Sequence, residues 1–226
     1  MIKIGLVYTG VTPQLIDIVE SELDKELGDK VKYISYKDPT IIAEARENGY
    51  VTKAAATRLF SLYLKAIEEG VDAILNICSS VGEAVDSVQD MSKYLGVPIV
   101  RIDEEMCRDA ARKSNRIGVI ATLATTMEPT KQTILRTARE IGQHPQLVDG
   151  LIEGAFDLDE EEFKQVMLSK AEELKNQVDL FVFCQGSMAY CDSYIQEKTG
   201  IETLSSPKYG ARALKQALIN TGKLEG

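Results

Sequence analysis

The chain has 226 residues, with 26 Lys and Arg against 35 Asp and Glu, which gives a formal net charge of −9. This length suits one large domain or two small ones. The hydrophobic fraction of 44% and the charged fraction of 27% exclude a disordered chain. An acidic chain without a clustered basic stretch is not expected to bind nucleic acid or an anionic membrane, and no apolar run is long enough to span a bilayer.

The cysteine and histidine content limits the possible chemistry. Four cysteines are scattered along the chain, at Cys78, Cys107, Cys184 and Cys191. They are too few for a disulfide scaffold, and Met1 leads directly into an apolar run without a signal peptide, so a reducing cytoplasm is expected. With His144 as the single histidine and no C-x-x-C motif, no metal site is predicted. Proton chemistry is therefore expected to use thiols or carboxylates.

Short β-branched runs alternate with amphipathic stretches of helical spacing along the whole chain. In chain order, the predicted strands are 2–8, 31–36, 72–77, 98–101, 116–121, 146–149, 179–183 and 201–204. The predicted helices lie near 13–27, 51–69, 81–95, 103–114, 128–141, 160–177, 187–199 and 207–221. Strands and helices that alternate in this way predict an α/β fold with parallel sheets and right-handed crossovers.

A weak internal repeat divides the chain in two. Three segments recur in the same order: 3–7 as 116–120, 71–78 as 178–184 with one residue fewer, and 95–100 as 199–204. They predict two pseudo-symmetric lobes, each a parallel sheet flanked by helices, with the active site in the cleft between them. The first lobe is expected to comprise residues 1–101 and 205–226, and the second residues 102–204.

The repeat places Cys78 on Cys184, each after a strand and before a helix. Ligands of parallel sheets bind beyond the carboxyl ends of the strands, and a helix N-terminus favours a thiolate and a bound carboxylate. Packing is the competing interpretation for any single cysteine. Cys107 has no counterpart and Cys191 aligns with an apolar residue, so both are predicted to be packing residues.

Hydroxyl side chains end the first strand of each half, at Thr9 before Gly10 and at Thr122 in the segment Ala121-Thr122-Leu123-Ala124-Thr125-Thr126. Such loops suit a carboxylate or another polar group, although a threonine can equally cap the following helix. Neither G-x-G-x-x-G nor a P-loop motif is present, so nucleotide binding is not indicated.

With these residues the chain resembles the aspartate/glutamate/hydantoin racemase superfamily. Residues 121–126 look like its A-T-x-x-T loop, and Cys184-Gln185-Gly186-Ser187-Met188-Ala189 looks like the second-cysteine segment of the hydantoin racemase branch. The resemblance implies a reaction without a cofactor, in which Cys78 and Cys184 are the two catalytic residues and act as base and acid on opposite faces of the stereogenic carbon. It also implies a set of residues that hold the substrate: Thr9, Gly10, Ser79, Ser80, Thr122, Thr125, Thr126, Gln185 and Gly186.

The chain departs from the glutamate and aspartate branches at three places. Tyr8-Thr9-Gly10 replaces an Asp-Ser, Gln185-Gly186 stands where a His is found, and Ser79-Ser80 replaces an Asn-Thr. The expected activity is therefore racemisation or epimerisation of an amino acid or a derivative with a carboxylate, without a named substrate. Two alternatives stay open: a cis–trans isomerase of a small dicarboxylate with Cys78 as nucleophile, and a non-catalytic small-molecule binding protein. A homodimer is the expected assembly.

Overall fold

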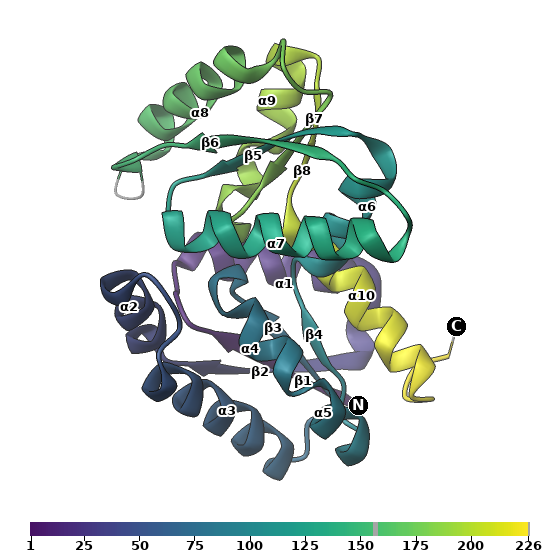
Figure 1. Cartoon of the computed structure of the whole chain (residues 1–226). Helices are drawn as coiled ribbons and strands as arrows, with labels where there is room; N and C mark the ends of the chain where they lie inside the picture. The colour runs from purple at the N-terminus through teal and green to yellow at the C-terminus, as the bar shows by residue number, and fades with distance from the viewer. Residues whose placement is uncertain (156–157, 226) are drawn as a thin grey trace. The chain divides into compact units, whose positions relative to one another are not determined.

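The computed structural model describes residues 1–155 and 158–225, and within them it contains two four-stranded parallel sheets (Figure 1). The first has the order β2-β1-β3-β4, formed by β1 Ile2–Tyr8, β2 Val31–Lys37, β3 Ala73–Ile77 and β4 Ile99–Arg101. The second has the order β6-β5-β7-β8, formed by β5 Arg116–Ala121, β6 Gln146–Leu151, β7 Leu180–Phe183 and β8 Glu202–Leu204. The same strand order in both halves confirms the predicted α/β class and its duplication.

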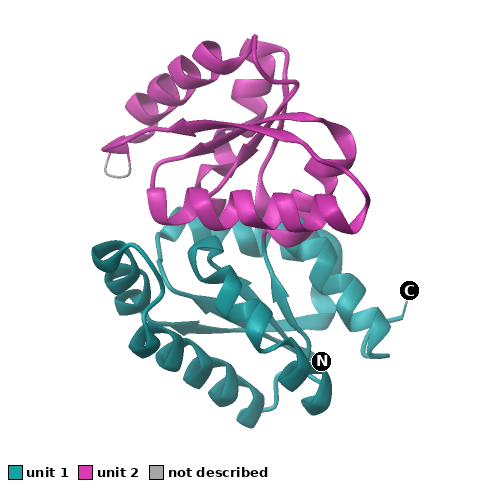
Figure 2. Cartoon of the chain, viewed as in Figure 1, with its two compact units in different colours: residues 1–102, 207–226 teal, residues 103–206 magenta. Residues whose placement is uncertain are grey.

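The chain divides into two compact units (Figure 2). Unit 1 consists of Met1–Ile102 and Pro207–Gly226, and unit 2 of Asp103–Ser206. The last helix thus returns to the unit in which the chain begins.

Helices cover both faces of the sheet in unit 1. They are α1 Pro13–Leu27, α2 Pro39–Asn48, α3 Lys53–Glu68, α4 Gly82–Ser87, α5 Gln89–Leu95 and α10 Ser206–Asn220, with the 3-10 turns η1 Gly28–Lys30 and η2 Ser79–Val81. One face packs on α1 and α10, where Leu6 lies in one cluster with Leu23 and Leu214. The other packs on α3, where Val7 and Leu59 share a second cluster. These two layers fix the carboxyl ends of β1 and β3.

Unit 2 repeats this arrangement with fewer helices. They are α6 Glu104–Lys113, α7 Ala124–Glu140, α8 Glu160–Leu174 and α9 Asp192–Thr199, with a 3-10 helix η4 at Gly186–Cys191. One core cluster joins Ile120 and Phe183 of the sheet to Phe163 of α8 and Ile195 of α9. Helices α6 and α7 pack on each other and on the sheet. No helix in the described residues is both long and apolar enough to cross a membrane.

The predicted helix at 81–95 is wrong in its continuity, because it is broken into η2, α4 and α5. Val88 leaves the helical conformation (φ −105°, ψ 10°). The side-chain amide of Gln89 donates to the carbonyl of Val85 at 3.1 Å and to that of Ile99 in β4 at 3.0 Å. This tertiary contact ties the break to the neighbouring strand. The predicted helix at 187–199 is likewise a 3-10 helix followed by α9.

Two further helix predictions differ from the structure. Helix α2 was not predicted, although Asp38 accepts a hydrogen bond from the Thr40 amide at 2.9 Å and Pro39 occupies the first turn, as in many helix starts. Helix α7 begins at Ala124 and not at 128, which places Pro129 inside the helix. A start at 128 would have put this proline in the first turn, where its missing N–H costs little.

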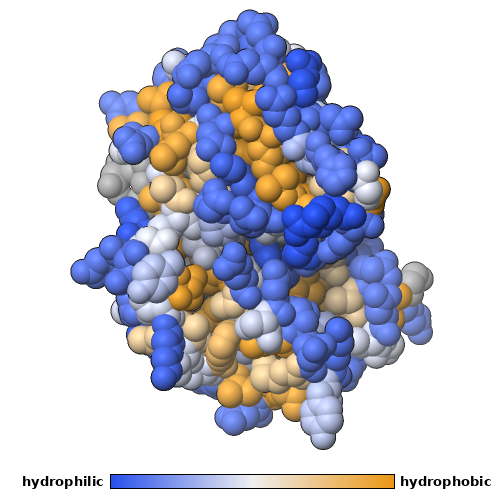
Figure 3. Space-filling view, viewed as in Figure 1, coloured by the Kyte–Doolittle hydropathy of each residue, from blue (hydrophilic) through white to orange (hydrophobic). Residues whose placement is uncertain are grey.

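On the face seen in Figure 3, hydrophilic residues cover much of the surface of each unit, with apolar patches between them. Among the described residues, Tyr94 (91%) and Tyr50 (65%) of unit 1 are large apolar side chains with high exposure. Exposed hydrophobic residues that stand singly are common on protein surfaces, so the predicted dimer stays a prediction.

Candidate functional site

The carboxyl ends of β1 and β3 lie side by side in unit 1. Tyr8 pairs with Ile77, so the next residues of the two strands, Thr9 and Cys78, are neighbours. Cys78 is a partly exposed residue. Thr9 is fully buried, and its Oγ1 has no hydrogen-bond partner. A buried hydroxyl without a partner costs free energy, and a substrate oxygen at this corner would remove that cost.

The other residues predicted for the first half surround this corner. Gly10 follows Thr9 and is partly exposed. Ser79 and Ser80 are 5% and 7% exposed and form η2, with Cys78 as its N-terminal flanking residue. The structure therefore brings all five predicted residues of unit 1 to the same end of the sheet.

A buried polar pair that the sequence analysis missed supports the backbone at Cys78. The Tyr63 hydroxyl donates to Oδ1 of Asn76 at 2.8 Å, and Nδ2 of Asn76 donates to the carbonyl of Cys78 at 3.1 Å. Burial raises the pKa of Tyr63 well above its usual value, so the phenol remains a hydrogen-bond donor. Asn76 is a polar residue within an apolar strand, and this is the feature of the sequence that could have indicated the pair.

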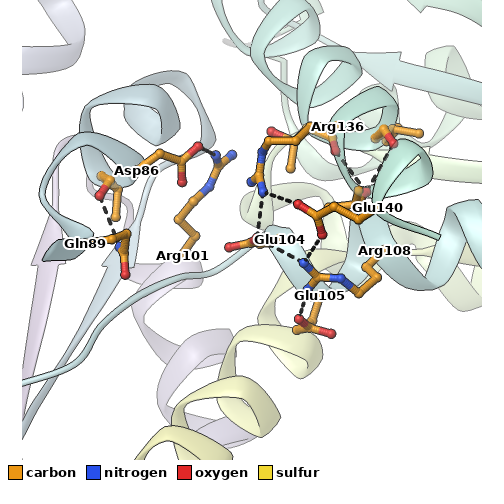
Figure 4. A network of polar contacts seen from close by, with 12 residues as sticks. Asp86, Gln89, Arg101, Glu104, Glu105, Arg108, Arg136 and Glu140 are labelled. Atoms are coloured by element: carbon orange, nitrogen blue, oxygen red, sulfur yellow. Dashed lines mark hydrogen bonds and ion pairs between the residues drawn. The ribbon is translucent and has the colours of Figure 1, made fainter. Parts of the chain in front are cut away.

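Arg101, the last residue of β4, is the second feature that sequence reasoning missed. Its side chain is 2% exposed, and Nη1 lies 2.7 Å from Oδ2 of Asp86 in α4 (Figure 4). The guanidinium also lies against Gly82, where a Cβ atom would be 2.3 Å from Nη2 of Arg101. Any side chain at residue 82 would therefore displace the buried arginine.

In unit 2, Thr122 and Gln185 hold each other at the ends of β5 and β7. The backbone amide of Thr122 donates to Oε1 of Gln185 at 3.0 Å, and Nε2 of Gln185 donates to Oγ1 of Thr122 at 2.5 Å. The side chain of Gln185 is thereby fixed by two hydrogen bonds. Thr122, unlike Thr9, has its hydroxyl satisfied within the protein.

Cys184 is buried inside unit 2, with no exposed surface. Burial raises the pKa of its thiol to about 12, against the opposing effect of a hydrogen bond with the Thr130 side chain of α7. Cys107 and Cys191, the two cysteines predicted to be packing residues, are equally buried. Burial therefore groups Cys184 with the packing cysteines and leaves Cys78 as the partly exposed cysteine.

The register of the sheets shows why the two cysteines differ. Gly5 of β1 pairs with Ile74 of β3, and the corresponding Gly118 of β5 pairs with Phe181 of β7. The two pairs are equivalent, because the preceding residues follow the same pattern in both sheets: the Asp72 amide donates to the carbonyl of Lys3, and the Asp179 amide to that of Arg116. The third strands of the two halves therefore align without a gap.

Without a gap, Cys78 corresponds to Gln185, and Cys184 corresponds to Ile77. The predicted equivalence of Cys78 and Cys184 is thus wrong by one residue. Successive side chains of a strand point to opposite faces, and Ile77 (4%) and Cys184 (0%) are both buried accordingly.

The remaining predicted residues of unit 2 lie at the start of helical segments and not in a loop. Thr125 and Thr126 belong to the first turn of α7, and Gly186 begins η4. The Oγ1 atom of Thr125 is buried without a partner, as in Thr9. Thr122, Thr125, Gln185 and Gly186 therefore gather at the carboxyl end of the second sheet.

Charged groups of unit 2 that Figure 4 labels lie on α6 and α7. Arg108 contacts Glu104, Glu105 and Glu140, and Arg136 contacts Glu104 and Glu140 at 3.0 and 3.1 Å. These groups join two helices. In the described residues, no cluster of three or more His, Cys, Asp or Glu side chains could hold a metal ion.

A model of the Asp/Glu/Hydantoin racemase family matches residues 4–214. The chain belongs to the Asp/Glu/hydantoin racemase family. The resemblance seen in the sequence is thus confirmed, and membership of this family supports an isomerase. No curated protein matches the chain significantly.

Solved structures agree on the fold of this family member. A glutamate racemase from Bacillus anthracis superposes with a TM-score of 0.74 at 18% sequence identity, and the superposition covers 99% of this chain and 84% of the racemase chain. An allantoin racemase from Klebsiella pneumoniae gives 0.72 at 12% identity, covering 100% and 91%. An arylmalonate decarboxylase gives 0.61 at 13% identity, covering 98% and 93%. At these identities the likeness establishes the two-lobed fold and not the substrate.

Proposed function

We propose that the chain is a cofactor-independent racemase or epimerase of an amino acid, or of an amino-acid derivative with a carboxylate. The observation that carries this proposal is the corner of unit 1, where the partly exposed Cys78 adjoins Thr9 with its buried, unpartnered hydroxyl. A base and an unsatisfied polar group side by side suit a substrate whose reacting carbon is bonded to a carboxylate.

In the proposed reaction, Cys78 as a thiolate removes the proton from the carbon next to the carboxylate. The electron pair stays on the substrate as an enolate-like anion. Cys184 as a thiol then gives its own proton to the opposite face, which leaves Cys78 protonated and Cys184 ionised. The reverse turnover restores the first state, so no oxidant or reductant is needed.

The raised pKa of Cys184, about 12, supports the role of proton donor, because the thiol stays protonated at neutral pH. Because Cys184 is completely buried, the proposal also requires that the substrate reach this thiol during turnover. Thr9, Gly10, Ser79 and Ser80 are proposed to hold the carboxylate or another polar group of the substrate. Thr122, Thr125, Thr126, Gln185 and Gly186 are proposed to do so from the second sheet.

A second candidate is favoured by the position of Gln185 in the place equivalent to Cys78. With Cys78 as the one reacting thiol, the reaction would be cis–trans isomerisation of a small unsaturated dicarboxylate. The Cys78 thiolate would add to one carbon of the double bond, and the electron pair would move into the adjacent carboxylate. Rotation about the resulting single bond and expulsion of the thiolate would then form the other isomer.

Deuterium exchange distinguishes the two candidates. Wild-type protein is incubated in D2O with enantiopure amino acids, hydantoins and unsaturated dicarboxylates, and exchange and isomer ratio are read by NMR. For the racemase we expect exchange at the reacting carbon in the wild type. Conversion of one enantiomer into the other, read by chiral chromatography of the same samples, should fall by about 10²–10⁴-fold in both Cys78→Ala and Cys184→Ala, because this conversion needs both thiols. Cys191→Ala, which removes an equally buried thiol, is the matched control and should retain activity.

Each outcome has a definite meaning. Isomerisation of a dicarboxylate that survives Cys184→Ala but not Cys78→Ala supports the one-thiol candidate and contradicts the two-thiol mechanism. If the wild type neither exchanges protons nor isomerises any member of the three classes, both candidates are rejected.

A further inference from the structure

A reactive Cys78 needs a source of positive potential, because a thiol ionises near neutral pH only where its thiolate is stabilised. From the sequence, a helix N-terminus after Cys78 is expected to supply it. In the structure, Cys78 precedes the three-residue η2 and the six-residue α4. Helices this short have few aligned peptide dipoles, so the charge must come from elsewhere.

The buried guanidinium of Arg101 is such a charge. Arg101 lies in register with Asn76, which is two residues before Cys78 and donates to the Cys78 carbonyl. Its side chain crosses Gly82, the first residue of the helix that follows Cys78 and η2. Burying an arginine is costly, and the absence of a side chain at residue 82 makes room for it.

Asp86, which forms an ion pair with Arg101, is more exposed to water than the arginine. The Asp86 side chain is 35% exposed, whereas that of Arg101 is 2% exposed. Water screens the carboxylate more than the guanidinium. Burial and an ionised Cys78 raise the pKa of Tyr63, and Arg101 lowers it. Cys78 and Arg101 thus lie within electrostatic reach of the same buried phenol.

We propose that Arg101, held over Gly82, is a positioning residue that acts through Cys78 by keeping its thiol ionised. This inference rests on the proposed role of Cys78. It applies to both candidate reactions, because a base and a nucleophile alike must be a thiolate.

Alkylation tests the proposal without a substrate. Cys78 is labelled at pH 7 with neutral iodoacetamide and with anionic iodoacetate, and the rate at each cysteine is followed by peptide mass mapping. Arg101→Met should slow labelling at Cys78 by about tenfold or more, because an adjacent opposite charge shifts such an ionisation by a unit or more. The loss should be greater with iodoacetate, which the guanidinium attracts, and Arg101→Lys should recover much of the rate.

Two further variants keep the test decisive if Arg101→Met folds poorly. Asp86→Asn removes a carboxylate that contacts Arg101 and should lower the pH at which the labelling rate of Cys78 is half-maximal, a result that a purely structural role for Arg101 would not produce. Gly82→Ala displaces the guanidinium without removing its charge and should slow labelling. Arg212→Met is the matched control. It breaks an exposed ion pair in which Nε of Arg212 lies 3.0 Å from Oε1 of Glu26, in the last turn of α1, and it should leave the labelling of Cys78 unchanged.

The results separate this inference from the proposed function. If wild-type Cys78 reacts no faster than the buried Cys184 and Cys191, the proposed role of Cys78 is wrong. If wild-type Cys78 reacts quickly but Asp86→Asn leaves the pH midpoint of labelling unchanged or raises it, or folded Arg101→Met labels like the wild type, the role of Arg101 is rejected.

Discussion

Thr9 and Thr122 end equivalent strands, but their hydroxyls differ. Thr9 Oγ1 is buried without a partner, whereas Thr122 Oγ1 accepts from Gln185. Valine has nearly the shape of threonine without its hydroxyl. Thr9→Val therefore removes an unsatisfied group and should raise the free energy of unfolding by up to about 1 kcal/mol. Thr122→Val leaves the side-chain amide of Gln185 without its acceptor and should lower the free energy of unfolding by about 1 kcal/mol.

Urea unfolding of both variants, followed by circular dichroism, measures the two changes of opposite sign. In the proposed enzyme, Thr9→Val should also weaken substrate binding and raise KM. A loss of stability in Thr9→Val would mean that its hydroxyl has a partner within the folded protein and is not reserved for a ligand.

At the residue scale, the sequence predicted the first half of the candidate site better than the second. Thr9 and Cys78 follow strands whose ends are adjacent, so chain position alone brought them together. The second half was misaligned by one residue, because matching two cysteines required a gap that the sheet register does not contain. Arg101 could not be assigned, because its importance depends on tertiary contact with Gly82.

At the scale of elements, local patterns predicted the parallel strands but not all helix limits. Strand identity depends on β-branched runs that are visible in the chain itself. The break between α4 and α5 depends on hydrogen bonds from Gln89 to Ile99 in another element, which no local pattern records. Tertiary contacts of this kind override helical periodicity in short segments.

Gly5 of β1 and Gly118 of β5 differ in how closely the side chain of the paired residue on the neighbouring strand approaches them. A Cβ on Gly118 of β5 would lie 2.7 Å from Cδ1 of the buried Phe181, whereas a Cβ on the equivalent Gly5 of β1 would lie 3.3 Å from Cγ1 of Ile74. Gly118→Ala should therefore lower the free energy of unfolding by about 1–3 kcal/mol through overpacking. Gly5→Ala should have a clearly smaller effect.

Thermal and urea unfolding of the two variants, carried out in parallel, measure the two changes in the free energy of unfolding. Each variant serves as the control for the other. Both variants add the same methyl group to the same strand position and change the unfolded chain equally. Equal losses of stability would contradict the difference in packing between the two sheets.

At the scale of the whole molecule, the duplication gives two units with separate cores, but only unit 2 is continuous in sequence. Unit 1 depends on α10, whose Ala211, Leu214 and Leu218 complete the cluster over β1 and β3. Each buried leucine contributes about 1.5–3 kcal/mol, against a total stability of about 5–15 kcal/mol for a domain. The loss of α10 thus removes much of the stability available to unit 1.

Three fragments test this dependence. Residues 103–206 should fold alone with a cooperative urea transition, and residues 1–102 should not, because the face that α10 covers would be exposed. Met1 and Leu224 line the same surface pocket, so a short Gly/Ser linker can join residue 225 to residue 1. The permuted chain 207–225–linker–1–102 restores α10 and should fold cooperatively. If residues 1–102 unfold as cooperatively as the permuted chain, and at the same urea concentration, then α10 is dispensable and the returning segment is not part of the first folding unit.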